Sequence, residues 1–123
     1  MKRRLPTPPL TKLVPPSSEA LLLARPGVLA RFCGLRAGKL ALITAPSGSG
    51  KSTLMAQGYL ALAAQGMDVC WLSLDASDND VQRFCSSLIA AVQRARPAAG
   101  GEAYAMMRSA ALVPLQEVMA SLI

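Results

Sequence analysis

Residues 45–52 constrain the fold of this chain more than any other segment, because their glycines and lysine stand at fixed spacing. The segment reads Ala-Pro-Ser-Gly-Ser-Gly-Lys-Ser. It matches the template G-x-x-x-x-G-K-[ST] at Gly50, Lys51 and Ser52, while Ala45 replaces the first glycine. Alanine can occupy this first position when its φ is negative, so the replacement leaves the phosphate-binding part of the loop intact. The segment therefore predicts a phosphate-binding loop, or P-loop.

Backbone groups carry most of the chemistry of such a loop. Gly48 and Gly50 let the chain turn inward, so the amides of residues 48–53 can face phosphate oxygens. A helix that begins near Lys51 adds unpaired N–H groups and the positive end of its dipole. Lys51 would contact the β- and γ-phosphates, and the Ser52 hydroxyl would bind Mg²⁺. The predicted nucleotide-binding residues are Ala45, Pro46, Ser47, Gly48, Ser49, Gly50, Lys51, Ser52 and Thr53.

Strand-like and helix-like segments alternate around this loop. The apolar runs 39–44 and 69–74 predict two buried parallel strands. The proline-free segment 51–65 predicts a helix that ends at Gly66. A further helix should follow the polar residues 75–80, with apolar positions at Val81, Phe84, Leu88 and Val92 and with Arg94 and Arg96 near its end. This order predicts an α/β fold of the P-loop NTPase three-layer type, incomplete because its parallel sheet is truncated.

The composition divides the chain into two regions. Residues 1–18 are rich in proline and basic residues without a period, which predicts a disordered leader that would need a partner surface to become ordered. Residues 19–123 would form the amino-terminal part of a P-loop NTPase domain. The basic leader lacks interleaved aromatic residues, which does not favour specific binding of nucleic acid.

Membrane insertion and secretion are not expected. Prolines interrupt the segment after the basic start, and no apolar run reaches the ~18 residues that span a bilayer. The three cysteines are widely separated and the chain has no histidine, so neither a zinc site nor a disulfide framework is indicated. We therefore expect a reduced, cytoplasmic protein.

Hydrolysis would need an acidic residue at the end of another strand, to hold Mg²⁺ through water. Asp75 is the one candidate by pattern. The alternative, which we favour, is a turn aspartate that caps local amides. The run Asp78-Asn79-Asp80 is interpreted in the same way, as a helix start rather than a metal cluster.

Three segments together resemble a known family: residues 45–54, Trp-Leu-Ser-Leu-Asp at 71–75, and Asp78-Asn79-Asp80 with Arg83-Phe84. They resemble MalT-type regulators, LuxR-family transcriptional activators whose amino-terminal module is a signal-transduction ATPase of the STAND class. The similarity runs from about Lys12 to the end. Val81 and Cys85 depart from the family, which often has proline and an aromatic residue there.

The resemblance implies a function for the whole protein. ATP with Mg²⁺ would be the ligand, and nucleotide binding would switch the regulator. Residues 22–26 are similar to an element that borders the adenine, which makes Arg25 a nucleotide-site candidate. The partners would be the remainder of a larger regulator and, only through a domain outside this chain, DNA. This chain would be the amino-terminal ATP-binding fragment.

Two alternatives remain open. A small P-loop kinase would use Asp75 as the base toward a substrate hydroxyl, with Arg94 or Arg96 neutralising the transferred charge. The second alternative is an inactive fragment, which would neither act in a regulator nor transfer a phosphoryl group. Because the paired acids expected for hydrolysis are absent from the sequence, we predict no turnover by this chain alone.

Overall fold

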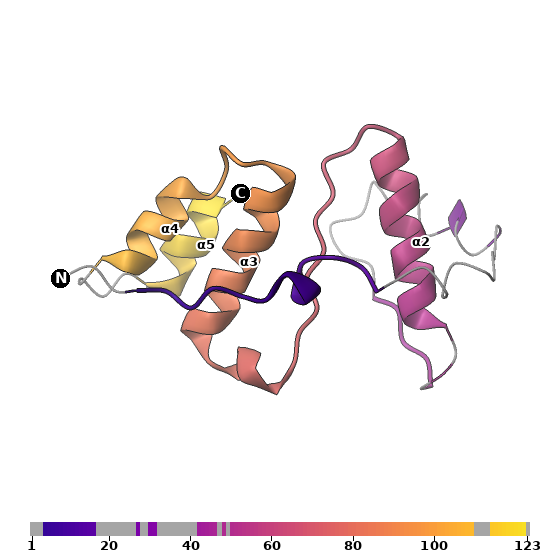
Figure 1. Cartoon of the computed structure of the whole chain (residues 1–123), viewed down its shortest axis with the longest axis horizontal. Helices are drawn as coiled ribbons and strands as arrows, with labels where there is room; N and C mark the ends of the chain where they lie inside the picture. Colours follow the sequence, from indigo (N-terminus) through magenta and orange to yellow (C-terminus); the bar gives the residue numbers. More distant parts are fainter. Residues whose placement is uncertain are drawn as a thin grey trace. The chain divides into compact units, whose positions relative to one another are not determined.

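The computed structural model describes residues 4–16, 27, 30–31, 42–46, 48, 50–109 and 114–122. The chain divides into two compact units, Met1–Val14 with Cys70–Ile123, and Pro15–Val69. The regular elements, four of them labelled in Figure 1, are η1 (Leu10–Lys12), α2 (Lys51–Ala64), η4 (Ala76–Asn79), α3 (Val81–Ala95), α4 (Gly101–Arg108) and α5 (Leu115–Leu122).

The predicted parallel sheet is wrong, because every regular element in the described part of the chain is helical. Residues 42–44 and 69–74 have no strand structure, and residues 39–41 lie outside the described residues. Leu42 is 83% exposed and Leu74 is 59% exposed, so these positions are not those of buried strands. A strand needs a ladder of paired backbone groups. Ser73 N–H donates to the Lys12 carbonyl at 2.9 Å, but no ladder continues from it in the described residues.

The core of the first unit lies among α3, α4 and α5, which stand next to one another in Figure 1. Ile89, Ala103 and Val118 each come from a different one of these helices, and each is at most 4% exposed. Their burial removes apolar surface from water, which is the main favourable term in folding. Partly buried side chains complete this core, namely Tyr104, Met106, Met107 and Leu122.

Helix α3 begins as the sequence predicts but buries a different set of positions. The Asp80 side chain caps it by accepting the Arg83 backbone N–H at 3.0 Å, which confirms Asp80 as its start, while Asp78 and Asn79 belong to η4. Cys85 and Ile89 are buried, whereas Val81 is 57% exposed. The buried stripe is therefore shifted by one residue along the helix from the predicted positions, and it includes the small residues Ser86, Ser87 and Ala91.

Residues 5–13, which we call the strap, cross α3 in the first unit (Figure 1). Leu5 and Leu13 are 6% and 9% exposed. The Ser86 hydroxyl of α3 donates to the Pro6 carbonyl at 2.5 Å. We expected the leader to need a partner surface, and for the strap that surface is α3 of the same chain.

In the second unit, helix α2 matches the predicted helix 51–65 and is confirmed. Gly66 follows its end with φ of 80°, in the left-handed region where glycine is favoured. Ala56 and Gly58 are its buried residues.

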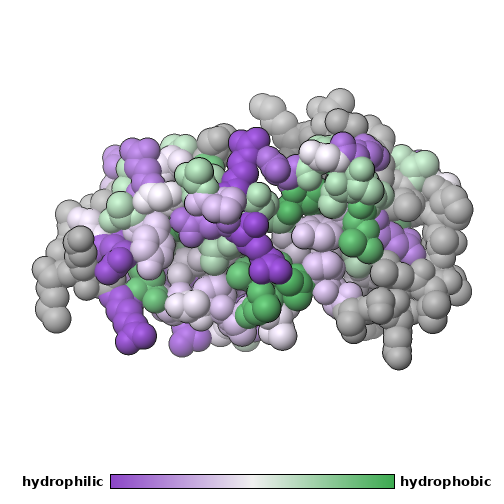
Figure 2. Space-filling view, turned by 45° about the horizontal axis from the view of Figure 1, so that its top comes forward, coloured by the Kyte–Doolittle hydropathy of each residue, from purple (hydrophilic) through white to green (hydrophobic). Residues whose placement is uncertain are grey.

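Hydrophobic residues also reach the surface, between hydrophilic ones (Figure 2). The exposed large hydrophobic residues of the first unit include Leu10, Leu74 and Val81. Isolated exposure of this kind is normal in folded proteins.

The turn between α3 and α4 provides a test of the packing. Gly100 has φ of 75°, and a Cβ placed there would lie 3.3 Å from methyl carbons of Ile89 and Leu122. We predict that Gly100→Ala lowers the free energy of unfolding by at least about 1–2 kcal/mol, which is the cost of the left-handed strain alone. Urea denaturation of the full chain, followed by helical circular dichroism, measures it.

Gly101→Ala is the matched control. A Cβ there meets nothing within 4 Å, and alanine favours the helix that begins at this residue. We expect unchanged or slightly higher stability. Equal destabilisation by both substitutions would contradict this account of the turn.

Candidate functional site

The predicted phosphate-binding loop adopts a backbone that only glycine readily accepts. Gly48 has φ of 81° and Gly50 has φ of 88°, both in the left-handed region. A Cβ on Gly48 would meet nothing within 4 Å, so its φ rather than crowding requires glycine. Of the other predicted site residues, Ser47, Ser49 and Arg25 lie outside the described residues.

The amino-terminal end of α2 follows the loop directly. Gly50 is its N-cap and provides no side chain to accept a hydrogen bond from the first-turn amides. Residues 51–54 of the first turn include no acidic side chain. The positive end of the helix dipole is therefore not offset locally, which is the condition under which an anion is favoured.

A pocket of about 350 Å³ opens at this end of the helix. Its lining consists of Gly48, Gly50, Lys51, Ser52 and Thr53. The structure thus brings the predicted lysine and hydroxyl residues together with both glycines. The Lys51 ammonium group donates a hydrogen bond to the Ala45 carbonyl, so this side chain folds back over the loop.

A magnesium ion fits this donor set only in part. The Ser52 hydroxyl, on an exposed residue of the first turn, is an oxygen ligand of the kind that Mg²⁺ takes. No group of three or more acidic, cysteine or histidine side chains gathers among the described residues. Mg²⁺ at Ser52 would therefore take its other ligands from phosphate oxygens and water, as it commonly does.

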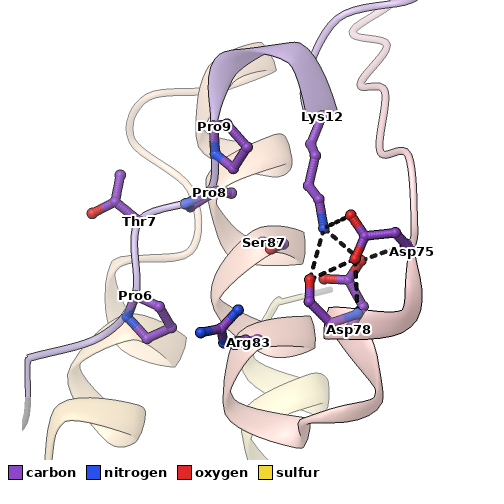
Figure 3. Close-up of a pocket in the computed structure, with 10 residues that line it drawn as sticks. Pro6, Thr7, Pro8, Pro9, Lys12, Asp75, Asp78, Arg83 and Ser87 are labelled. Atoms are coloured by element: carbon purple, nitrogen blue, oxygen red, sulfur yellow. Dashed lines mark hydrogen bonds and ion pairs between the residues drawn. The ribbon is translucent and has the colours of Figure 1, made fainter.

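A second cluster, in the first unit, joins the strap to the turn before α3. The Lys12 ammonium lies 2.7 Å from Asp78 Oδ2 and 2.9 Å from Asp75 Oδ2 (Figure 3). The Lys12 and Asp78 side chains are 14% and 5% exposed. We call these three residues the Lys12 clamp. The sequence analysis missed Lys12, since no local pattern pairs it with residues so distant in the chain.

Asp75 also caps the 3-10 turn η4, in agreement with the turn interpretation. Its side chain accepts from the Ser77 N–H at 2.8 Å, and its own N–H donates to Asp78 Oδ2 at 2.8 Å. The Ser77 hydroxyl and then Lys12 lower the pKa of Asp75 to about 2. The pKa of Asp78 is also lowered, chiefly by Lys12, and the pKa of Lys12 is raised by both aspartates.

These contacts bear on the proposed roles of Asp75. A carboxylate with a pKa of about 2 is a weak base at neutral pH, which disfavours proton abstraction from a substrate hydroxyl. Arg94 lies in the last turn of α3 and Arg96 caps its end. Asp75 and the loop belong to different units, so a shared site for them stays a prediction.

No protein-family model matches the chain, and no solved structure matches it. The resemblance to MalT-type regulators stays a prediction carried by the residues themselves. Within the ranges that the structure describes, no helix has both the length and the apolar composition needed to cross a bilayer.

The clamp predicts a specific dependence on acid. Because the pKa of Asp75 is lower in the folded state than its ordinary 3.8, its contribution is present above about pH 4 and is lost as pH falls toward 2. We expect Asp75→Asn and Lys12→Met each to flatten the fall in unfolding free energy over this window, measured by urea denaturation at several pH values. An acid dependence identical to that of the wild type would contradict the clamp.

Proposed function

We propose that this chain binds ATP with Mg²⁺ at residues 45–53, as the amino-terminal fragment of a MalT-like, LuxR-family transcriptional regulator. The observation that carries the proposal is the left-handed backbone of Gly48 and Gly50, next to the uncapped amino end of α2. Lys51 and Ser52 line the pocket at the same point.

The chemistry of phosphate recognition follows from these groups. First-turn amides of α2 and the amides of the glycine-rich loop would donate to phosphate oxygens. Lys51 would exchange the Ala45 carbonyl for oxygens of the β- and γ-phosphates, which gives a stronger, charge-assisted contact. Bound Mg²⁺ would neutralise phosphate charge, with the Ser52 hydroxyl holding it. The proposal needs the loop and α2, and it does not require a parallel sheet.

The proposal concerns binding rather than turnover. In the longer regulator, nucleotide binding would favour one of two states, and DNA would be bound by a domain outside this chain. We place the protein in the cytoplasm, because Cys70 and Cys85 are free thiols and a reducing compartment keeps thiols in this form. Because Cys70 is exposed, its thiol depends on a reducing compartment more than a buried thiol does to stay reduced.

Binding of labelled ATP with Mg²⁺ to the full chain tests the site. We predict that Lys51→Ala weakens binding about 10- to 100-fold, the range that corresponds to one charge-assisted contact of ~1.5–3 kcal/mol. Equal affinity of the wild type and Lys51→Ala for ATP would contradict the assignment of residues 45–53 as the ATP-binding site.

A pair of glycine substitutions separates the site from general backbone strain. Gly48 and Gly66 have nearly the same φ, 81° and 80°, and neither position is crowded. We expect Gly48→Ala to weaken ATP binding strongly and Gly66→Ala to leave it near the wild-type value, although both carry a similar strain. If both substitutions weakened ATP binding by the same factor, the loss of affinity would be an effect on folding and not on the site. Transfer of the labelled γ-phosphoryl group of ATP to a hydroxyl acceptor by the wild-type chain would instead support the kinase alternative, whereas release of inorganic phosphate would show hydrolysis.

A further inference from the structure

A second cavity, separate from the loop, lies within the first unit. Its volume is about 280 Å³. Figure 3 shows strap residues 6–9 at one side of it, the clamp at the other, and Arg83 and Ser87 of α3 between them. None of its lining residues belongs to the proposed nucleotide site. The function proposed above leaves this cavity without a role.

Two polar side chains of α3 line the cavity. Arg83 and Ser87 are four residues apart on α3, so they lie on the same face of the helix (Figure 3). Arg83 is exposed and Ser87 is only 4% exposed, and the Ser87 hydroxyl is not among the buried polar atoms without a partner, of which the described residues contain one, Arg108 Nε. The Arg83 guanidinium has no carboxylate partner in the described part of the chain, although Asp75 and Asp78 line the same cavity.

The strap supplies an apolar wall. Thr7 lines the cavity, but Figure 3 shows its hydroxyl turned away from Arg83 and Ser87. Pro6, Pro8 and Pro9 line it as well, and their rings offer apolar surface without side-chain polar groups. A ligand that brings an acceptor would replace water as the partner of the donors that α3 presents to the cavity.

The charges of the cavity select the kind of ligand. Lys12 is held by both aspartates, so its charge is already compensated. The formal charges of Lys12, Arg83, Asp75 and Asp78 sum to zero. A ligand with one negative charge can pair with Arg83, whereas a dianion would meet repulsion from the two carboxylates. Guanidinium groups bind carboxylates through two parallel hydrogen bonds.

We propose that this cavity binds a small organic monocarboxylate. The carboxylate would accept hydrogen bonds from the Arg83 guanidinium and from the Ser87 hydroxyl. Its apolar part would lie against the prolines of the strap. Because the ligand contacts both the strap and α3, it would hold the strap in place.

Ligand-detected NMR titration of the full chain tests the proposal with 2-methylpropanoate, its neutral amide, and inorganic phosphate as probes. We expect saturable binding of the carboxylate, binding of the amide at least about tenfold weaker, and weaker binding of phosphate than of the carboxylate. Arg83→Gln should weaken carboxylate binding about tenfold or more. Arg94→Gln, an exposed arginine of the same helix that does not line the cavity, should leave it unchanged.

Three results would overturn the proposal: no saturable binding of the carboxylate, equal binding by the wild type and Arg83→Gln, or tighter binding of phosphate than of the carboxylate. If Arg83→Gln loses helical circular dichroism, Ser87→Ala decides instead, because it removes the hydroxyl that lines the cavity and alanine favours the helix. That variant should weaken carboxylate binding several-fold, and unchanged affinity would remove the cavity as the site. ATP binding by the loop should be the same in every variant, so the two proposals fail separately.

Discussion

The ammonium group of Lys12 holds together segments of the first unit that are far apart in the chain. Its partner Asp78 is 66 residues away in sequence, and the Asp78 side chain is only 5% exposed. Removing Lys12 would leave that carboxylate buried without its counter-ion, which is strongly unfavourable. Lys12 therefore ties the strap to the turn before α3, next to the cavity, and the hydrogen bond from Ser86 to Pro6 adds a second polar contact between the strap and α3. The apolar contacts of Leu5 and Leu13 then hold the strap along its length.

In the second unit the controlling constraint is conformational rather than electrostatic. Two glycines in the left-handed region lie immediately before α2, and the first turn of this helix has neither a side-chain cap nor an acidic residue. The N-cap side chain accepts no hydrogen bond from the backbone amides at that point, and Lys51 adds a positive charge. An anion is the partner that such an end of a helix favours. ATP is the anion that the motif and the family resemblance indicate.

Local features were predictable from the sequence, whereas long-range pairing was not. The extent of α2, the stop at Gly66 and the Asp80 cap of α3 follow from residues adjacent in the chain. The parallel sheet was predicted from two apolar runs, but a strand exists only if a neighbour pairs with it, and apolar composition does not specify that neighbour. The Lys12 clamp was missed for the same reason, because nothing near Lys12 in sequence indicates that Asp75 and Asp78 will contact it. Asp75 consequently stood as a catalytic candidate, although its carboxylate is engaged by Ser77 and Lys12.

The central claim is that the amides of the loop and of the first turn of α2 bind the phosphates of ATP. Amide NMR of the ¹⁵N-labelled full chain, titrated with ATP and Mg²⁺, measures those groups directly. The account predicts saturable shifts concentrated at Gly48, Gly50, Lys51, Ser52 and Thr53, with little change at Ser77 and Asp78 of the clamp. Shifts that are absent from residues 48–53, or that are no larger there than in α4, would contradict it.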